Sequence, residues 1–388
     1  MHSVKLFSAI LAVAGAASAA TTCTSDVKVT QPTPVIECDV VDADIIIDPQ
    51  VSGSLSLEGP KQIKGDLIVN NATQLVGITS SSINAIGGTL RLQGLQLLSS
   101  FNMQALKSVN KLELINLAQL SGLTLGTSGV TKASSIKIQD TFISDLSGLN
   151  IATADNFTIA NNGRLTMFNS KLENVTSTLS VVDNAGSMQI NMSKLESVGV
   201  LDFRSIKSFD APLLQTANRI SFQESPDLLS ISANNLTQIK DSLTLDNNKK
   251  LANISFTSLE KINGDMTIRN NTALLKINKF PELKTIGGAV LLAGSFDTVE
   301  IPKLNDIKGA VTVTSTTDIS DFCGFFDNLA KTKAIQGKES CTSNNSKANE
   351  GGKGGTSGGN STDSAAMSLG VNHAMLGFAA VAGFAQLI

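Results

Sequence analysis

A short motif of alternating apolar and polar residues recurs along the chain and ends each time in an asparagine-rich turn. In its first clear copy, Leu67 and Val69 stand two positions apart and precede Asn70 and Asn71. A spacing of two places both apolar side chains on the same face of a β-strand. The motif therefore predicts a short strand with one buried face, followed by a tight turn. The same order recurs in the segments Phe157–Asn162, Leu243–Asn248 and Met266–Asn271.

The motif repeats at a nearly constant interval. The gaps between successive copies run from 19 to 24 residues, which leaves no room for a long amphipathic helix in any repeat. Short strands at such a period are typical of a solenoid, in which each coil buries its apolar face against the next. We therefore expect an all-β solenoid of about twelve coils. The first apolar residues of the predicted coils are Leu67, Leu90, Leu112, Ile136, Phe157, Leu179, Leu201, Ile220, Leu243, Met266, Val290 and Val311.

The paired asparagines mark one corner of each predicted coil. Asparagine tolerates the left-handed backbone of a sharp corner, and stacked asparagine side chains can hydrogen-bond from coil to coil. We therefore interpret the pairs as structural, and we interpret the nearby Asp241, Asp246 and Asp265 as solvated turn residues. A calcium or ligand site at the same corner is the alternative.

Two cysteines precede the repeats, Cys23 and Cys38, and two follow them, Cys323 and Cys341. Four cysteines allow three disulfide pairings. We favour Cys23–Cys38 and Cys323–Cys341, because short loops close at lower entropic cost. Each bridge would then close one open end of the solenoid, where a cap is needed. A zinc site is the alternative, although the spacing contains no CxxC motif.

The first residues have the pattern of a secretory signal peptide. Lys5 supplies the positive charge, residues 6–17 form a short apolar region, and Ala19 ends a small-residue cleavage motif. We expect residues 1–19 to be removed and residues 20–341 to form the solenoid. Secretion leads into an oxidising compartment, which suits disulfides.

The last residues have the pattern of a GPI-attachment signal. Residues 374–388 are almost wholly apolar, and fifteen residues are few to cross a bilayer core of about 30 Å. Small residues precede this tail, with a spacer at residues 363–373 between them. We expect attachment at Asn360, with Gly359 and Ser364 as alternatives. A tail-anchored transmembrane helix is the competing interpretation.

The segment between the solenoid and the anchor, residues 342–360, is rich in Gly, Ser and Asn and is predicted to be a stalk. Residues 361–388 would be the removed propeptide. Sequons for N-glycosylation are scattered over the solenoid and the stalk, and in a secreted chain we expect most to be used. The predicted acceptors are Asn71, Asn156, Asn174, Asn191, Asn235, Asn253, Asn270 and Asn344; the sequon at Asn360 would stay unused if the anchor is attached there.

The sequence offers little catalytic chemistry. Its two histidines, His2 and His373, both fall in segments expected to be removed, so the mature chain would lack the commonest general base and metal ligand. Trp and Tyr are absent, which disfavours a groove that stacks sugar rings. A net charge of −3 provides no basic footprint for nucleic acid. We expect no enzyme activity, no catalytic residue, no metal and no cofactor.

A β-helix enzyme that acts on polysaccharides is the remaining enzymatic alternative. Such enzymes gather carboxylates and Arg or Lys side chains on one sheet face. Arg91, Arg164, Arg204 and Arg219 fall in different predicted coils, which disfavours this interpretation.

The chain resembles the fungal GPI-anchored cell-wall organisation proteins of the ECM/SPS2 type, whose body is similar to the receptor L-domain. The resemblance rests on Ile63-Lys-Gly-Asp-Leu67, on its later copies such as Ile286-Gly-Gly-Ala-Val290, on the cysteines at both ends and on the C-terminal signal. It implies a right-handed parallel β-helix and a role in cell-wall integrity and morphogenesis. It implies no catalytic residues.

The function expected from these features is that of a non-enzymatic surface glycoprotein needed for cell-wall organisation. Its partners would be the GPI lipid and cell-wall glycans, with no nucleic acid, and its place would be the outer face of the plasma membrane and the wall. The alternative is a ligand-binding receptor or adhesin. A continuous sheet face without glycans would favour the alternative, and glycans on every face would oppose it.

Overall fold

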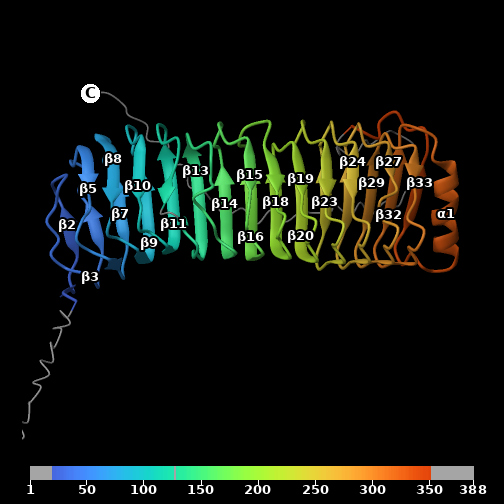
Figure 1. The fold of residues 1–388 in the computed structure, drawn as a ribbon. Coiled ribbons are helices and arrows are strands. Elements are labelled where there is room, and N and C mark those ends of the chain that lie inside the picture. The colour runs from blue at the N-terminus through green and yellow to red at the C-terminus, as the bar shows by residue number, and fades with distance from the viewer. Residues whose placement is uncertain (1–19, 126–127, 351–388) are drawn as a thin grey trace, which may run out of the picture. The chain divides into compact units, whose positions relative to one another are not determined.

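A computed structural model describes residues 20–125 and 128–350 of this chain. The predicted signal peptide, the predicted attachment sites Asn360, Gly359 and Ser364, and the predicted propeptide lie outside the described residues. The described part is built almost wholly of short parallel β-strands that stack coil upon coil (Figure 1).

The longest sheet, which we call the main sheet, receives one strand from each coil. In the described residues all its strand pairings are parallel. Its strands are β2 (Val27–Val29), β4 (Ile45–Ile47), β7 (Leu67–Asn70), β9 (Ala85–Gln93), β11 (Ser108–Leu117), β13 (Ser135–Thr141), β14 (Thr153–Ala160), β16 (Asn174–Val182), β18 (Ser197–Arg204), β20 (Thr216–Gln223), β23 (Leu243–Asp246), β26 (Met266–Arg269), β29 (Val290–Gly294), β32 (Val311–Ser315) and β33 (Glu339–Thr342).

The predicted repeat is confirmed residue by residue. Leu67 pairs with Leu90, and the register continues without exception through all twelve predicted residues to the pair Val290 and Val311. Coils that contain β2 and β4 precede the predicted ones, and β33 follows them in the same register. The right-handed sense of the coil stays a prediction.

Two further sides complete each coil. After the asparagine corner, the chain enters a second side made of β5 (Gly53–Ser56), β8 (Leu75–Ser80), β10 (Ser100–Met103), β12 (Thr124–Leu125), β15 (Met167–Asn169), β17 (Gln189–Asn191), β19 (Ser208–Asp210), β21 (Ser230–Ser232), β24 (Asn253–Ser255), β27 (Lys276–Ile277) and β30 (Thr298–Val299). A third side leads back to the main sheet through β1 (Thr22–Cys23), β3 (Val40–Val41), β6 (Gln62–Ile63), β22 (Gln238–Ile239), β25 (Lys261–Ile262), β28 (Thr285–Ile286), β31 (Asp306–Ile307) and the first residues of several longer main-sheet strands.

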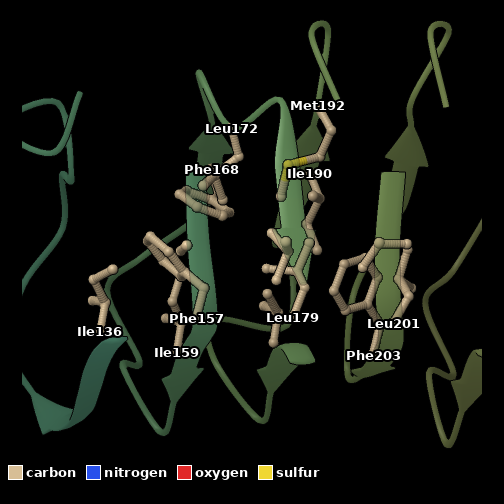
Figure 2. Packing of buried hydrophobic residues seen from close by; sticks show 14 of the residues in the cluster. Ile136, Phe157, Ile159, Phe168, Leu172, Leu179, Ile190, Met192, Leu201 and Phe203 are labelled. Carbon is tan, nitrogen blue, oxygen red and sulfur yellow. The ribbon is translucent and has the colours of Figure 1, made fainter. Parts of the chain in front are cut away.

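The space between the three sides is filled by apolar side chains. Figure 2 shows the inward residues of successive coils in contact, and the rings of Phe157 and Phe168 meet across the coil with centroids 5.4 Å apart. The six residues predicted to point inward are all buried: Leu67, Val69, Leu243, Leu245, Met266 and Ile268. Because no coil could bury these side chains alone, stacking supplies the stability of the fold.

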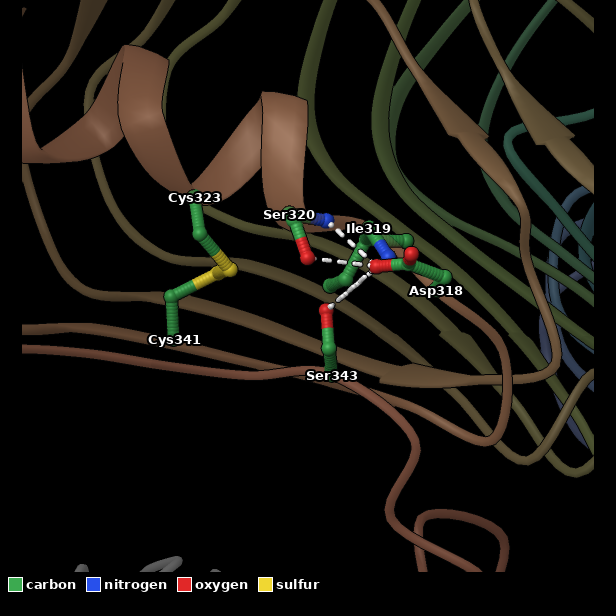
Figure 3. The surroundings of a disulfide bond; sticks show 6 residues. All are labelled: Asp318, Ile319, Ser320, Cys323, Cys341 and Ser343. Atoms are coloured by element: carbon green, nitrogen blue, oxygen red, sulfur yellow. Dashed lines mark hydrogen bonds between the residues drawn. A yellow bond between two sulfur atoms is a disulfide. The ribbon is translucent and has the colours of Figure 1, made fainter.

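Both ends of the solenoid carry the predicted disulfides. Cys23 is bonded to Cys38 and Cys323 to Cys341, with Cα atoms 5.8 and 5.5 Å apart. At the C-terminal end, helix α1 (Ser320–Lys331) covers the last coil and buries Phe326. Figure 3 shows Cys323 on this helix joined to Cys341, which lies on β33. Within residues 20–125 and 128–350, no helix is long and apolar enough to span a bilayer.

The inward position of Leu243 gives a test of this architecture. Replacing it by Asp puts an unpaired charge into a dry core and should lower the free energy of unfolding by about 3–5 kcal/mol. Thr244 is the next residue on the same strand and points outward. Thr244→Asp should therefore change the free energy of unfolding by less than about 1 kcal/mol. Chemical denaturation of both secreted variants measures the difference. Equal losses in the two variants would contradict the assigned inward and outward faces.

Candidate functional site

The corner after each main strand has a left-handed backbone. Asn71, Asn161, Asn247 and Asn270 have φ angles of 56°, 55°, 58° and 56°. In other coils the same position is taken by Asn116, Asp140, Asp183, Ser205, Glu224 and, with φ 68°, Gly94. Asparagine, aspartate and glycine are the residues that adopt this conformation most readily. The first asparagine of the pairs at Asn161, Asn247 and Asn270 therefore turns the chain, whereas in the pair Asn70 and Asn71 the second asparagine does so.

In the other three pairs the second asparagine, Asn162, Asn248 or Asn271, points into the coil and joins it to its neighbours. Asn248 is fully buried, and its Oδ1 accepts a hydrogen bond from the backbone amide of Ser225 at 3.1 Å. Its Nδ2 donates to the carbonyl of Phe222 at 2.9 Å. Its own backbone amide donates to Oδ1 of Asn271 at 3.0 Å, so the pattern continues in the next coil. We call these side chains the asparagine ladder.

The ladder has a second section nearer the N-terminus. Asn184 Oδ1 accepts hydrogen bonds from the backbone amide and from Nδ2 of Asn162, both at 3.0 Å. Asn162 Oδ1 in turn accepts from the backbone amide and the hydroxyl of Thr141. These bonds agree with the structural interpretation of the corner. Within the described ranges, no three His, Cys, Asp or Glu side chains lie close enough together to hold a metal ion.

The prediction that Asp241, Asp246 and Asp265 are solvated turn residues holds in part: Asp265 is exposed and Asp241 is half-exposed, but Asp246 lies on β23 with most of its side chain buried, and all three bond a neighbouring coil. Asp241 Oδ2 lies 2.6 Å from Nη2 of Arg219, and Asp246 Oδ2 lies 2.7 Å from Nη2 of Arg269. The hydrogen bond that the Arg269 guanidinium donates to Asp246 raises the pKa of this guanidinium. Asp265 Oδ1 accepts the backbone amide of Ala289 at 2.7 Å. Each carboxylate therefore joins two neighbouring coils. This role depends on which residues, about one repeat apart in the sequence, lie next to each other in the stack.

The eight predicted glycan acceptors lie on several sides of the solenoid. Asn71, Asn270 and Asn344 have left-handed backbones, and the first two stand at the corner after the main strand. Asn191 and Asn253 lie on the second side, in β17 and β24, and Asn235 lies in the turn after β21. Asn156 and Asn174 lie in β14 and β16, ahead of the main-strand segment. Asn174 and Asn270 are half-buried and the others are exposed; their glycosylation stays a prediction.

Two rows of outward side chains run along the main sheet, one in register with Ile68 and the other with Asn70. Neither of these two outer rows contains a predicted glycan acceptor. Where the first row crosses β14 to β32, its residues are mostly small and polar: Thr158, Ser180, Asp202, Ser221, Thr244, Thr267, Leu291 and Thr312. This face, which we call the open face, is therefore a long sheet surface that no predicted glycan is attached to.

The open face also gathers three of the five arginines, Arg91, Arg204 and Arg269, which single-residue inspection of the sequence does not reveal. Their partners are carboxylates on the same sheet or its corner: Arg91 with Glu113, Arg204 with Glu224 and Arg269 with Asp246. A further pair, Arg219 with Asp241, lies just ahead of the main-strand segment, in the row of Asn156. The offsets of these arginines from the repeat would have located them, because each lies within three residues of the first apolar residue of its coil. The pairs balance the charge of the face.

One carboxylate of the open face is partly withdrawn from water. Burial raises the pKa of Asp202, although the positive charge of Arg204 opposes the shift. Asp202 lies between Ser180 and Ser221 in the outer row. The face thus offers hydroxyl groups and paired charges for polar contacts.

Comparison with known proteins gives several relatives. The chain is 32% identical over 306 residues to the protein ecm33 of Aspergillus fumigatus, a match that covers 78% of this chain and 75% of the relative. It is 31% identical over 345 residues to a cell surface GPI-anchored protein of Arthroderma benhamiae, covering 88% of each. It is 30% identical over 311 residues to the sporulation-specific protein 2 of Saccharomyces cerevisiae, covering 79% of this chain and 61% of that protein. No family model and no solved structure matches the chain.

Removal of one ladder side chain tests its structural role. Asn248→Ala leaves the amide of Ser225 buried without its partner and removes one hydrogen bond from the carbonyl of Phe222, which should lower the free energy of unfolding by about 2–4 kcal/mol. Asn263 is exposed, so Asn263→Ala is the matched control. It should change the free energy of unfolding by less than about 0.5 kcal/mol. Thermal and denaturant unfolding of the secreted variants provide the measurement. A ladder variant as stable as the control would show that the corner does not depend on these bonds.

Proposed function

Because this chain belongs to the fungal Ecm33/Sps2 family of cell-surface proteins, we propose that it is a non-enzymatic, GPI-anchored glycoprotein that organises the cell wall. The main support for the proposal is that the chain belongs to this family. The fold adds to this support, because polar side chains at the corners bond one coil to the next. The asparagines of the ladder and the aspartates of the corners are bonded within the protein.

The cellular place follows from the names of the relatives. They include cell surface GPI-anchored proteins of Arthroderma benhamiae and Candida albicans and a cell wall protein of Schizosaccharomyces pombe. This protein is accordingly a GPI-anchored protein of the fungal cell surface, at the outer face of the plasma membrane and in the wall. Attachment of the lipid at Asn360 is part of the proposal.

The absence of enzyme activity is also part of the proposal. The predicted mature sequence has no histidine, since His2 and His373 fall in the segments expected to be removed. The arginines that gather on the open face are each paired with a carboxylate, which supports a role for them in joining coils. We infer that the protein acts on the wall by binding and spacing its components.

A specific observation favours a second, compatible candidate, a ligand-binding surface protein. The open face extends along the stack and carries no predicted glycan acceptor in its outer rows, whereas acceptors occur on the second side and at the corners. A surface that must stay accessible to a partner is expected to lack glycans. The partner proposed for this face is a cell-wall glycan, held by hydroxyl and amide groups.

Gene deletion tests the proposed role in the cell wall, and insertion of a glycan tests the open face as the binding surface. A deletion strain should become hypersensitive to agents that perturb the wall, and the wild-type gene should restore resistance. Thr312 is exposed in the outer row of the open face, and Thr312→Asn completes a sequon with Val313 and Thr314. A glycan there should abolish the rescue if the open face binds the wall component.

The matched control adds a glycan on the second side. Ser230→Asn completes a sequon with Ile231 and Ser232, and Ser230 pairs in register with the predicted acceptor Asn253. This variant should restore resistance as well as the wild type does. Equal rescue by both glycosylated variants would reject the open face as the binding surface, and normal wall resistance of the deletion strain would contradict the proposed wall role.

A further inference from the structure

A groove of about 540 Å³ lies between the last strand of the second side, β30, and the N-terminal turn of helix α1. Ligand pockets in proteins usually enclose about 300–1,000 Å³. Apolar side chains from both walls line the groove, among them Val299 and Ile301 beside β30 and Ile319, Phe322 and Phe325 at the helix. The groove is therefore large enough, and apolar enough, to hold a few residues of a peptide.

One wall of the groove is an open strand edge. β30 pairs with β27 through Thr298 and Val299, and among the described residues no strand lies on its other side. The amide of Glu300 donates to Ile277 of β27 at 2.9 Å. Because backbone groups alternate in direction along a strand, the amide and carbonyl of Val299 point the opposite way, toward α1. An unpaired edge of this kind accepts an added strand.

Carboxylates stand on both walls of the groove, Asp297 and Glu300 beside β30 and Asp318 and Asp321 at the helix. Asp318 is held in place, since its Oδ1 accepts the amide of Ser320 at 3.0 Å and the hydroxyl of Ser343 at 3.3 Å (Figure 3). The hydrogen bonds from Ser320 lower the pKa of Asp318, so this carboxyl group is ionised at neutral pH.

These four charges lack a counter-ion in the described part of the chain. No Lys or Arg there forms an ion pair with any of them, although nine such pairs occur on other coils. The carboxylates also do not converge on one point, because no three acidic side chains of the described residues form a group that could hold a metal ion. Negative charge spread along two walls matches several cationic groups in a row.

We propose that the groove binds an extended segment of another polypeptide that carries lysine or arginine side chains, and that this segment adds a strand to β30. Its backbone would bond the free edge at Val299. Its apolar side chains would contact Phe322 and Phe325, and its cationic side chains would meet Glu300 and Asp321. The site is separate from the open face, so it allows the protein to bind a second molecule at its C-terminal end.

Fluorescence anisotropy with the secreted, full-length protein tests the proposal. The probe is a dye-labelled octapeptide of alternating lysine and valine, and the control probe has glutamate in place of lysine. All variants carry Asn344→Gln, which removes a predicted glycan acceptor. The backbone amide of Asn344 donates to the carbonyl of Thr317, next to Asp318, so a glycan on Asn344 would lie beside the groove. We expect saturable binding of the lysine probe that weakens with salt, and no binding of the glutamate probe.

Two matched double variants separate the groove from general surface charge. Glu300→Gln with Asp321→Asn should weaken binding by about tenfold, because two charges of the site are lost. Glu196→Gln with Asp210→Asn removes two exposed acids elsewhere and should leave binding within about twofold. A lysine probe with alternate amides methylated should also bind at least about tenfold more weakly, because it cannot complete a strand ladder.

Several results would overturn the proposal: no binding of the lysine probe, equal loss in both double variants, or undiminished binding of the methylated probe. The chain itself supplies a rival occupant, because Asn349 bonds to Ser295 at 2.6 Å and Lys353 follows soon after in the sequence. If the wild type fails to bind and Lys353→Ser binds, the groove belongs to the protein's own stalk and the outside partner is rejected.

Discussion

The fold depends on one constraint: the chain must turn sharply at the end of every main strand without leaving buried backbone groups unpaired. A left-handed residue makes the turn, and the next side chain satisfies the buried amide and carbonyl groups that the turn exposes. At Asn247 and Asn248 both tasks fall to asparagine, the first turning the backbone and the second bonding Ser225, Phe222 and Asn271. Where the ladder residue is absent, a short polar residue such as Ser225 or Thr141 takes its place.

This division of tasks determines where function can reside. Since the inward positions and the corners are committed to packing and hydrogen bonding, the outward rows of the sheets are left free to vary. On the second side and at the corners they carry predicted glycan acceptors such as Asn253 and Asn71. On the main sheet they form the open face, where small hydroxyl side chains alternate with paired charges. The groove at β30 arises differently, because helix α1 stands where the next strand of the second side would be.

The sequence predicted the regular part of the molecule closely and its exceptions poorly. The residues from Leu67 to Val311 were found because both their apolar spacing and their turn recur. The last strand was missed because Glu339 occupies the inward position that pairs with Val311. Burial raises the pKa of the Glu339 carboxyl, and the nearby Asp327 adds to the shift. No pattern of apolar residues predicts a carboxyl group at such a position.

The candidate surfaces were predictable only in part. The glycan acceptors are visible as sequons, and the disulfides followed from loop length. The ion pairs that join coils, such as Arg219 with Asp241, were missed because they connect residues a full repeat apart. The groove required the position of α1 relative to β30, which depends on three-dimensional packing and not on local spacing.

Amide hydrogen exchange with residue resolution tests the central claim most directly. The backbone amides of Thr141, Asn162, Ser225 and Asn248 donate to ladder side chains, so the account predicts exchange as slow as that of the adjoining main strands. The amide of Gly163, in an exposed turn, should exchange rapidly in the same protein. Rapid exchange of the four ladder amides, at a rate near that of Gly163, would contradict the claim that the asparagine ladder holds the coils in register.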